Sequence, residues 1–505
     1  MTAKVVPDTR ISRSSSMTRT SFWFVGIAVV CCLFADISIT TLDPWGEFSR
    51  MAKGALAPDF LAVADIGFVI VQTVAFAFCG VALGAVGGFF LAQVFHFGPV
   101  RWTCAFVRAI HELFWALIFL QMLGLTPLTG VLAIAIPYAG ICAKVYAETL
   151  EEAEAPAVQV LPSGSGNIST FFYARLPDVW IHIKNYTGYR FECGLRSSAV
   201  LGFVGLPTLG FYLETAFSEG NYSEAAALLI IFYVLIMTLR QWVRPKLLGI
   251  YIIAAPFLLG AGATIDMSNV ARFFTHDIIP SPIRNGDLAG AAAWQNMANW
   301  LQELLLNQAI PGAIATVLLT QIALVLTGAV ALVLFPLISD KFLGRIGRTL
   351  GHGFLVVLRS TPEIILAYVF LQLWGPSMLP AIVALALHNG AIIGHLMGRY
   401  SDNVRLRPDS PRGLNRYSYE IVPRIYGQFL AFLFYRWEII MRETAILGIL
   451  GIMTLGFFID SALADIRLDR ALFLISITAF LNIGIDILSR RIRRHLRLSQ
   501  QVEPV

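Results

Sequence analysis

The sequence predicts an all-α integral membrane protein of about twelve transmembrane helices, in two parallel six-helix repeats related by a pseudo-two-fold axis along the membrane normal. Two observations support this fold class. Hydrophobic residues make up 57% of the 505 residues and charged residues 14%, whereas a soluble domain carries roughly 25% charged residues. In addition, one stretch of sequence occurs twice, 246 residues apart. We therefore expect a first repeat at residues 1–246, with its core at about 66–246, and a second at 247–505, with its core at about 310–497.

The repeated stretch starts with Tyr-Arg-aromatic-Glu and ends with Leu-Gly. It runs from Tyr189 to Gly210 and again from Tyr435 to Gly456, and 11 of the 22 aligned pairs are identical. An earlier block, from Arg108 to Gly124, matches Arg359 to Gly375 at a spacing of 251. The second copy has therefore lost residues in the polar segment between the two blocks, and we expect this variable segment to contact another protein.

The first half contains apolar runs close to the roughly 20 residues that cross a bilayer. One span is expected on the helix that carries the repeated stretch, and the others near residues 21–41, 66–95, 109–123, 128–147 and 225–237. Basic residues precede the first span and no small-residue cleavage site is evident, so we expect an uncleaved anchor with a cytoplasmic N-terminus.

The second half repeats this order. Its spans are expected near residues 247–263, 310–338, 354–374 and 379–397, on the second repeated stretch, and in a last run that ends at Arg490. The short basic loops all fall on one side, which makes the C-terminus cytoplasmic as well. An even number of spans per copy gives both copies the same orientation, so the repeats are parallel and a pathway along their common axis is expected. A transporter or a channel is the leading class.

Other classes of protein lack their signatures in this chain. The six cysteines show no metal-ligand spacing, and there is no Gly-x-x-x-x-Gly-Lys-Ser/Thr nucleotide motif. The net charge of +5 clusters in short loops and does not indicate nucleic-acid binding. His388 and Asn389 are polar within a span, with Pro137 and Tyr138 at the matching positions, but no His/Asp/Glu set is shared by both halves. We expect no catalytic residue, no metal site and no cofactor in this chain.

Charged residues recur inside the apolar segments, where ionisable groups are costly and usually functional. Glu192 and Arg196 are four residues apart, as are Glu438 and Arg442, which is the favourable order for an ion pair on one helix face. Either each pair only stabilises its own buried charges, or Arg196 and Arg442 face the path and transiently attract an anionic substrate. Further candidates for the path are Arg190, Arg436 and Glu443.

A second charged set begins the spans that follow the basic loops. Its expected role is anchoring at the inner membrane surface. It consists of Arg108, Glu112, Arg359 and Glu363.

The polar segment between the two blocks has the features of a docking element in both halves. In the first copy, Pro156 suits the first turn of a short helix that ends at Gly164. Leu176-Pro177 follows it, and the second copy has Pro411, Gly413 and then Val422-Pro423. A capped segment at the same place in both halves favours docking to a partner protein over a plain surface loop.

Together these elements resemble the membrane permease subunits of ATP-binding-cassette (ABC) importers, and in particular their phosphonate and phosphite branch, within the binding-protein-dependent transport inner-membrane component family. The Arg-x-x-Pro-Glu element is intact in Arg359-Ser360-Thr361-Pro362-Glu363 and has a histidine in place of proline in Arg108-Ala109-Ile110-His111-Glu112. The Tyr-Arg-aromatic-Glu and Leu-Gly-x-x-Gly elements are present twice. The resemblance covers most of both halves.

The resemblance implies a type I ABC importer permease fold in the cell inner membrane that imports phosphonate, or a related phosphorus oxyanion, by alternating access. It implies that the polar segments are coupling helices for two ABC ATPase subunits, which carry ATP and Mg²⁺, and that an extracytoplasmic substrate-binding protein delivers the small anionic substrate. Two departures concern the coupling helices. Val158-Gln159 stand where the family has an acidic residue and alanine, and Ser410 stands where the first copy has Gly164.

Other functions remain open at this point. One is a permease of the same superfamily for another small solute, such as an amino acid or phosphate. Another is an ATP-independent secondary transporter or channel, and a more distant one is an integral-membrane enzyme.

Overall fold

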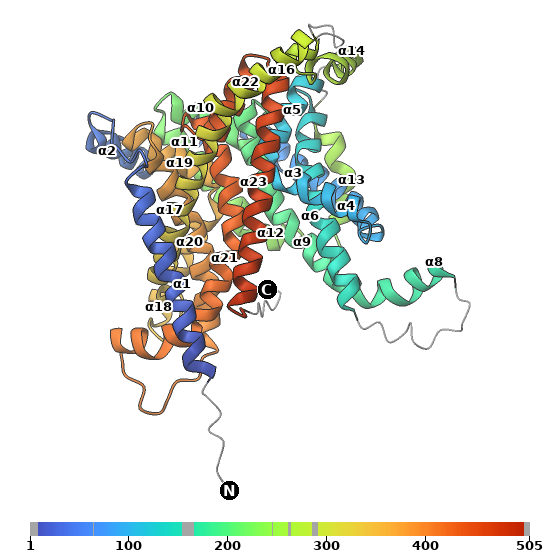
Figure 1. Ribbon diagram of the computed structural model, residues 1–505. Helices are drawn as coiled ribbons and strands as arrows, with labels where there is room; N and C mark the ends of the chain where they lie inside the picture. Colours follow the sequence, from blue (N-terminus) through green and yellow to red (C-terminus); the bar gives the residue numbers. More distant parts are fainter. Residues whose placement is uncertain are drawn as a thin grey trace. The chain divides into compact units, whose positions relative to one another are not determined.

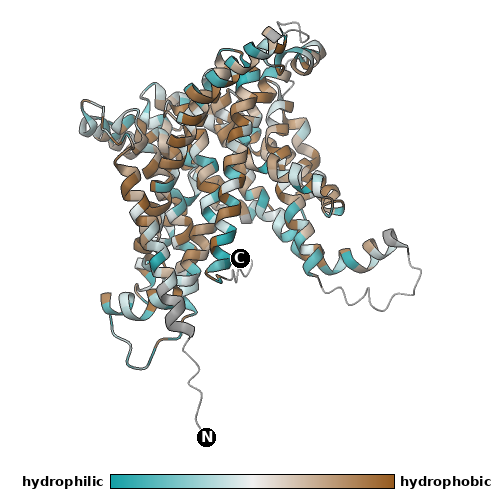
Figure 2. Ribbon diagram, viewed as in Figure 1, coloured by the Kyte–Doolittle hydropathy of each residue, from teal (hydrophilic) through white to brown (hydrophobic). Residues whose placement is uncertain are grey.

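The computed structural model describes residues 9–63, 65–153, 166–244, 246–260, 264–284 and 291–498 (Figure 1). Helices and their connections account for all of these residues, which contain no β-strand, so the predicted all-α class is confirmed. Hydrophobic residues dominate the long helices, while hydrophilic residues collect at the C-terminal end of α23 (Leu468–His495; Figure 2).

The helices of the first half are α1 (Thr9–Cys32), α2 (Pro44–Leu56), α3 (Ile66–Gln93), α4 (Gly98–Ala109), α5 (Glu112–Leu123), α6 (Pro127–Glu152), α8 (Asn167–Thr170), α9 (Leu176–Val200), α10 (Leu209–Ser218), α11 (Tyr222–Met237) and α12 (Leu239–Trp242). Those of the second half are α13 (Leu248–Leu258), α14 (Met267–Arg272), α15 (Ser281–Arg284), α16 (Ala291–Leu304), α17 (Ile310–Leu334), α18 (Arg345–Ser360), α19 (Glu363–Trp374), α20 (Met378–Asp402), α21 (Val422–Ile446), α22 (Leu455–Ala464) and α23.

The apolar helices follow one order in both halves. A short apolar helix is followed by a long helix, a pair bent by 93° or 92°, a second long helix, a pair bent by 50° or 46°, and a last apolar helix. Within the described ranges, five helices are long and apolar enough to cross a membrane, or nine segments if each bent pair counts as one span, and three shorter apolar helices complete the order.

The span predicted near residues 354–374 is sharply bent within its bounds, which corrects the sequence expectation there, whereas the span predicted near 109–123 corresponds to α5 and starts at the matching bend. The chain turns by 93° between α4 and α5 and by 92° between α18 and α19. Thr361 is extended (φ −68°, ψ 122°) because the following proline, Pro362, disfavours helical geometry in the residue before it. The first half has His111 instead, whose Nδ1 accepts a hydrogen bond from the Leu113 N–H (3.2 Å) and caps α5. Charged residues flank both bends, Arg108 and Glu112 at the first and Arg359 and Glu363 at the second, and their expected role as surface anchors did not predict a change of helix direction.

Prolines also widen the start of three long helices. A π-helical turn precedes Leu176-Pro177, Val422-Pro423 and Ile310-Pro311, at Phe171–Arg175, Arg416–Ile421 and Leu305–Ala309 respectively. Proline has no N–H to donate and its ring pushes away the carbonyl four residues earlier, so a wider turn relieves the clash. The two predicted docking segments therefore lead directly into α9 and α21.

The Leu-Gly-x-x-Gly element creates the shallower bends. Gly205 (φ +90°) and Gly451 (φ +84°) adopt the left-handed conformation that ends the preceding helix. A Cβ on Gly210 would lie 1.7 Å from the Ala199 carbonyl oxygen, and the same distance separates a Cβ on Gly456 from the Ala445 carbonyl oxygen. Only glycine allows α10 and α22 to pack this closely against the helices that precede them.

By their internal contacts, the residues form two compact units that do not coincide with the two repeats. The first unit comprises Met1–Glu47, Gln295–Ile466 and Phe480–Val505, and the second comprises Phe48–Trp294 and Arg467–Ala479. The division at residues 246 and 247 rests on the sequence repeat and remains a prediction.

The first helix of each half belongs to the unit built mainly from the other half. In the first unit, α1 lies along α17 (Figure 1), where Gln321 Nε2 donates to the Phe24 carbonyl (3.1 Å) and the Phe24 ring contacts Phe434 at 5.1 Å between centroids. In the second unit, α13 packs on α3, where Gln72 Nε2 donates to the Leu258 carbonyl (2.7 Å). Each first helix is therefore held by residues that are distant in sequence.

Candidate functional site

A buried polar cluster lies next to each sharp bend. The second cluster, in the first compact unit, consists of Glu363 at the start of α19, His388 and Asn389 on α20, and Glu443 on α21, all of them buried. Asn389 Nδ2 donates to Glu443 Oε2 (2.8 Å) and to the Leu385 carbonyl (3.1 Å). The cluster joins three helices at the level of the bend.

Hydrogen bonding sets the tautomer of His388. Its Nδ1 lies 2.8 Å from the Thr361 carbonyl oxygen, and because a carbonyl only accepts, Nδ1 carries the proton. Its Nε2 then faces Glu363 Oε2 at 3.9 Å. One ligand atom from each of Glu363, His388 and Glu443 lies within 4.8 Å of the others, a nitrogen and oxygen set that divalent metals accept.

The first cluster, in the second compact unit, consists of His111, Glu112, Tyr138 and Ser197, from the bend and from α5, α6 and α9. The Ser197 hydroxyl donates to Glu112 Oε1 (2.8 Å) and lies 3.1 Å from the Tyr138 hydroxyl. His111 Nε2 lies 3.6 Å from Glu112 Oε2. The Glu112 carboxylate at the start of α5 thus accepts a hydrogen bond from Ser197 on α9, and Ser197 is in turn hydrogen-bonded to Tyr138 on α6.

The two clusters occupy matching positions in the repeats. Glu112 and Tyr138 match Glu363 and Asn389 at the spacing of 251, and Ser197 matches Glu443 at the spacing of 246. The second cluster has two carboxylates and the first has one. The two clusters therefore do not share a set of ligand atoms that would suit a metal ion. The two halves share no His/Asp/Glu set for this reason, and the clusters correspond only when hydroxyl and amide positions are aligned with carboxylates.

The first copy also holds Arg190 within tyrosine rings. Its guanidinium donates from both Nε (2.9 Å) and Nη2 to the Tyr186 hydroxyl, and it lies 4.9 Å from the Tyr186 ring centroid, 5.7 Å from that of Tyr189 and 5.8 Å from that of Tyr138. Cation–π attraction stabilises a guanidinium in such surroundings. The second copy has Phe432 where the first has Tyr186, so this arrangement is not repeated around Arg436.

The anticipated ion pairs along α9 and α21 stay predictions. Arg196 Nη2 contacts Cys193 Sγ at 3.8 Å, and Glu192 is half-buried on the same helix. Glu438 and Arg442 occupy the matching positions on α21.

The other predicted residues that the structure describes lie on α4, α18 and α19 and in a turn at Gly413. Arg108 and Arg359 lie in the last turns of α4 and α18, on the helices before the bends. Burial of Glu363 in the second cluster differs from the surface anchoring expected for it. Gly413 forms a turn (φ +64°) in which the Pro411 carbonyl accepts a hydrogen bond from Arg416 Nε (2.8 Å). Pro156 and Gly164 lie outside the described residues.

The chain is similar to several individual proteins of known sequence. No family model and no solved structure matches the chain. It is 25% identical to the phosphate-import permease protein PhnE of Mycolicibacterium smegmatis over 460 residues, which cover 86% of both proteins. It is 28% identical to the phosphite transport system permease protein PtxC of Stutzerimonas stutzeri over 218 residues, 41% of this chain and 79% of the relative.

A third relative matches a shorter region. The chain is 32% identical over 158 residues to the putative phosphite transport system permease protein HtxE of Stutzerimonas stutzeri, and these residues cover 30% of the chain and 60% of that relative. The chain is therefore a homologue of the permease proteins of phosphite, phosphonate and phosphate transport systems.

Proposed function

We propose that this chain is the membrane permease of an ATP-driven importer, and that its cargo is phosphonate or a related phosphorus oxyanion, such as phosphite or phosphate. The observation that carries the proposal is the alignment with the mycobacterial phosphate-import permease, because it extends over 86% of both chains and so includes both halves of this one.

The proposed architecture is two parallel repeats of six membrane segments, residues 1–246 and 247–505. The shared order of apolar helices and bent pairs supports it, since each half supplies six segments in the same sequence. An even number of segments per repeat returns the chain to the same side, and the basic loops favour cytoplasmic termini in a multi-pass inner-membrane protein.

In this proposal, arginines on α9 and α21 supply transient contacts for the cargo. A guanidinium matches two oxygens of a phosphorus oxyanion in geometry and charge. Arg190, Arg196, Arg436 and Arg442 lie on these two helices, each of which follows a predicted docking segment directly. Movement of the docking segments would therefore be transmitted to the helices that carry the arginines.

The proposed partners are two ABC ATPase subunits, which bind ATP and Mg²⁺, and an extracytoplasmic substrate-binding protein. The chain itself would need no cofactor. The ATPases would bind the two docking segments, and their closure would switch the permease between inward-facing and outward-facing states. These segments contain Pro156, Gly164 and Leu176-Pro177 in the first half and Pro411, Gly413 and Val422-Pro423 in the second.

The test is reconstitution of the chain in liposomes with its ATPase and binding protein. Phosphite, methylphosphonate and phosphate are each added, and ATP hydrolysis and uptake of the ligand are measured. We expect at least one of these anions, delivered by the binding protein, to stimulate both. If an amino acid stimulates the complex and no phosphorus oxyanion does, the cargo is wrong. If the chain transports alone and does not co-purify with an ATPase, the importer mechanism is wrong.

A further inference from the structure

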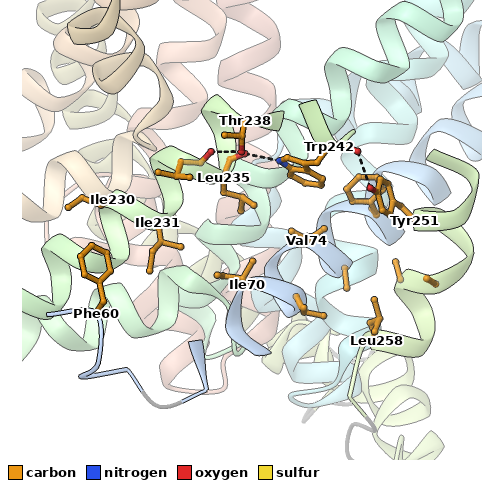
Figure 3. Close-up of a pocket in the computed structure, with 16 residues that line it drawn as sticks. Phe60, Ile70, Val74, Ile230, Ile231, Leu235, Thr238, Trp242, Tyr251 and Leu258 are labelled. Carbon is orange, nitrogen blue, oxygen red and sulfur yellow. Dashed lines mark hydrogen bonds between the residues drawn. The ribbon is translucent and has the colours of Figure 1, made fainter. Parts of the chain in front are cut away.

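An elongated apolar groove lies in the second compact unit, between α3, α11, α12 and α13 (Figure 3). Its volume is about 660 Å³ and almost all of its lining is carbon. Val74 on α3, Ile231 and Leu235 on α11, and Ala254 on α13 are among the residues that line it. Three of these helices, α3, α11 and α13, are apolar, so within a bilayer the part of the groove between them is exposed to lipid and not to water.

Polar atoms gather at one end of this groove. Figure 3 shows Thr238, Trp242 and Tyr251 at that end, with Phe60 and Leu258 away from it. The polar atoms are already engaged, since Thr238 Oγ1 donates to the Val234 carbonyl (2.7 Å), Trp242 Nε1 to the Leu235 carbonyl (3.4 Å) and the Tyr251 hydroxyl to the Trp242 carbonyl (3.0 Å). An occupant therefore needs to be apolar along the groove itself.

Two basic side chains follow the polar end directly in sequence. Arg244 and Lys246 are exposed, and they lie between Trp242 and the start of α13 at Leu248. Basic residues beside a membrane segment attract the anionic lipids of the cytoplasmic leaflet, and tryptophan and tyrosine favour the level of the headgroups. The groove thus has an apolar body, an aromatic polar rim and a cationic outer end.

We propose that this groove binds one acyl chain of an anionic phospholipid from the cytoplasmic leaflet, with the headgroup held by Arg244 and Lys246. The length of the groove fits this occupant. From Tyr251 to Leu258 the α13 helix rises about 10 Å, at roughly 1.5 Å per residue, within the roughly 15 Å of hydrocarbon that one leaflet provides. The lipid fills the space between α13 and α11, and so helps to hold α13 against α3.

The experiment compares lipid retention by the wild-type chain and matched variants. The full chain is purified from membranes, exchanged into mild detergent, supplied with phosphatidylglycerol or phosphatidylcholine, and examined by native mass spectrometry. We expect one tightly held phosphatidylglycerol per chain and weaker retention of phosphatidylcholine. Arg244→Gln with Lys246→Gln is expected to weaken phosphatidylglycerol binding about 30-fold, because each basic side chain near the surface contributes about 1 kcal/mol. The matched control for the loss of two positive charges is Arg345→Gln with Arg348→Gln, on α18 in the other unit. We expect this control to change phosphatidylglycerol binding little.

A second pair of variants tests the groove itself. Ala254→Phe places a ring in the groove, whereas Ile253→Phe places one on the neighbouring residue of the same helix, which does not line the groove and is 69% exposed. We expect the first to abolish tight retention and the second to leave it unchanged. If Ala254→Phe does not fold, the proposal is tested by phosphatidylglycerol retention in the Arg244→Gln and Lys246→Gln variant, whose substitutions are at exposed positions.

Three results would overturn the proposal. One is a wild-type chain that retains no phospholipid under these conditions. Another is retention of phosphatidylcholine equal to that of phosphatidylglycerol, which would mean that the basic pair does not select the headgroup. The third is equal loss of lipid in the test and control variants, which would mean that the lipid is bound only as part of the general lipid shell. None of these results depends on the cargo of the permease, so the inference and the proposed function can fail separately.

Discussion

Adding one methyl group to Gly210, at the start of α10 just after the bend at Gly205, is expected to destabilise the protein severely. In Gly210→Ala, the new Cβ would lie 1.7 Å from the Ala199 carbonyl oxygen, a backbone atom that cannot rotate away. Since real Cβ contacts essentially never fall below 3.0 Å, α10 must move by at least 1.3 Å. That movement also breaks the hydrogen bond from the Leu209 N–H to Thr73 Oγ1 (2.9 Å). Overpacking costs about 1–3 kcal/mol and an unsatisfied buried amide about 1–3 kcal/mol more, so we expect a total of about 2–6 kcal/mol.

The assay is the apparent melting temperature of the purified chain in detergent, followed by size-exclusion fluorescence. Gly188→Ala on α9 is the matched control, because nothing lies within 4 Å of its new Cβ. It is expected to stabilise by up to about 1 kcal/mol through helix propensity. Thr73→Val introduces no overpacking. It removes the hydrogen bond from the Leu209 N–H and the one that Thr73 Oγ1 donates to the Val69 carbonyl (2.8 Å), and it is expected to cost about 1–3 kcal/mol. Equal melting temperatures for Gly210→Ala and Gly188→Ala would refute the close packing of α10.

Three further predictions concern the clusters and the division of the chain. Tyr186→Phe removes the hydroxyl that accepts from Arg190 and is expected to cost about 1.5–3 kcal/mol, and Tyr186→Leu about 0.5–2 kcal/mol more through the lost cation–π contact; melting temperatures that match wild type would contradict this. Asn389→Leu removes the donor to Glu443 and is expected to lower stability by about 1–3 kcal/mol or more, while the control Asn299→Leu, on the exposed surface of α16, is expected to have little effect. Residues 1–246 and 247–505, expressed separately, are each expected to aggregate, because α1 packs on α17 and α13 on α3, and to co-purify when expressed together; a monodisperse single half would argue against this exchange.

Local sequence patterns predict the helices better than their bends. Apolar runs and basic loops predicted α3, α6, α17 and α20 closely, because composition and length determine whether a helix suits the hydrocarbon core. The bend at Pro362 was not predicted because Arg359 and Glu363, which flank it, were interpreted as anchors at the membrane surface and not as the adjoining ends of two helices. Its counterpart at Ile110 carries no proline at all, and capping by His111 becomes evident only from the hydrogen bond to Leu113.

These local patterns do not predict which segments distant in sequence pack against one another. Nothing in the sequence near Phe24 or Leu258 indicates that α1 contacts α17 or that α13 contacts α3. The sequence predicts the buried clusters only in part. It places Tyr138 and Asn389 at matching positions of the two repeats. The sequence indicates Glu443 only as a candidate for the path, and it does not indicate Ser197, because the repeat aligns a hydroxyl with a carboxylate and a search for identical residues passes over such a pair.

The mismatch between the clusters bears on where an anionic cargo would bind. In the second cluster, Glu363 and Glu443 offer carboxylate oxygens within 4.8 Å of one another and of a histidine, whereas the first cluster has a serine in place of the second carboxylate. Carboxylates repel a phosphorus oxyanion, and this repulsion is strongest where the surroundings are poor in water. The second cluster is therefore suited to joining α19, α20 and α21 and not to holding cargo. Because Arg190 has three tyrosine rings around it and Arg436 has a phenylalanine at one of these positions, the two halves also present their guanidinium groups differently. The duplication has thus kept the helices, bends and glycine contacts, while the charge and hydrogen-bonding groups beside them have diverged.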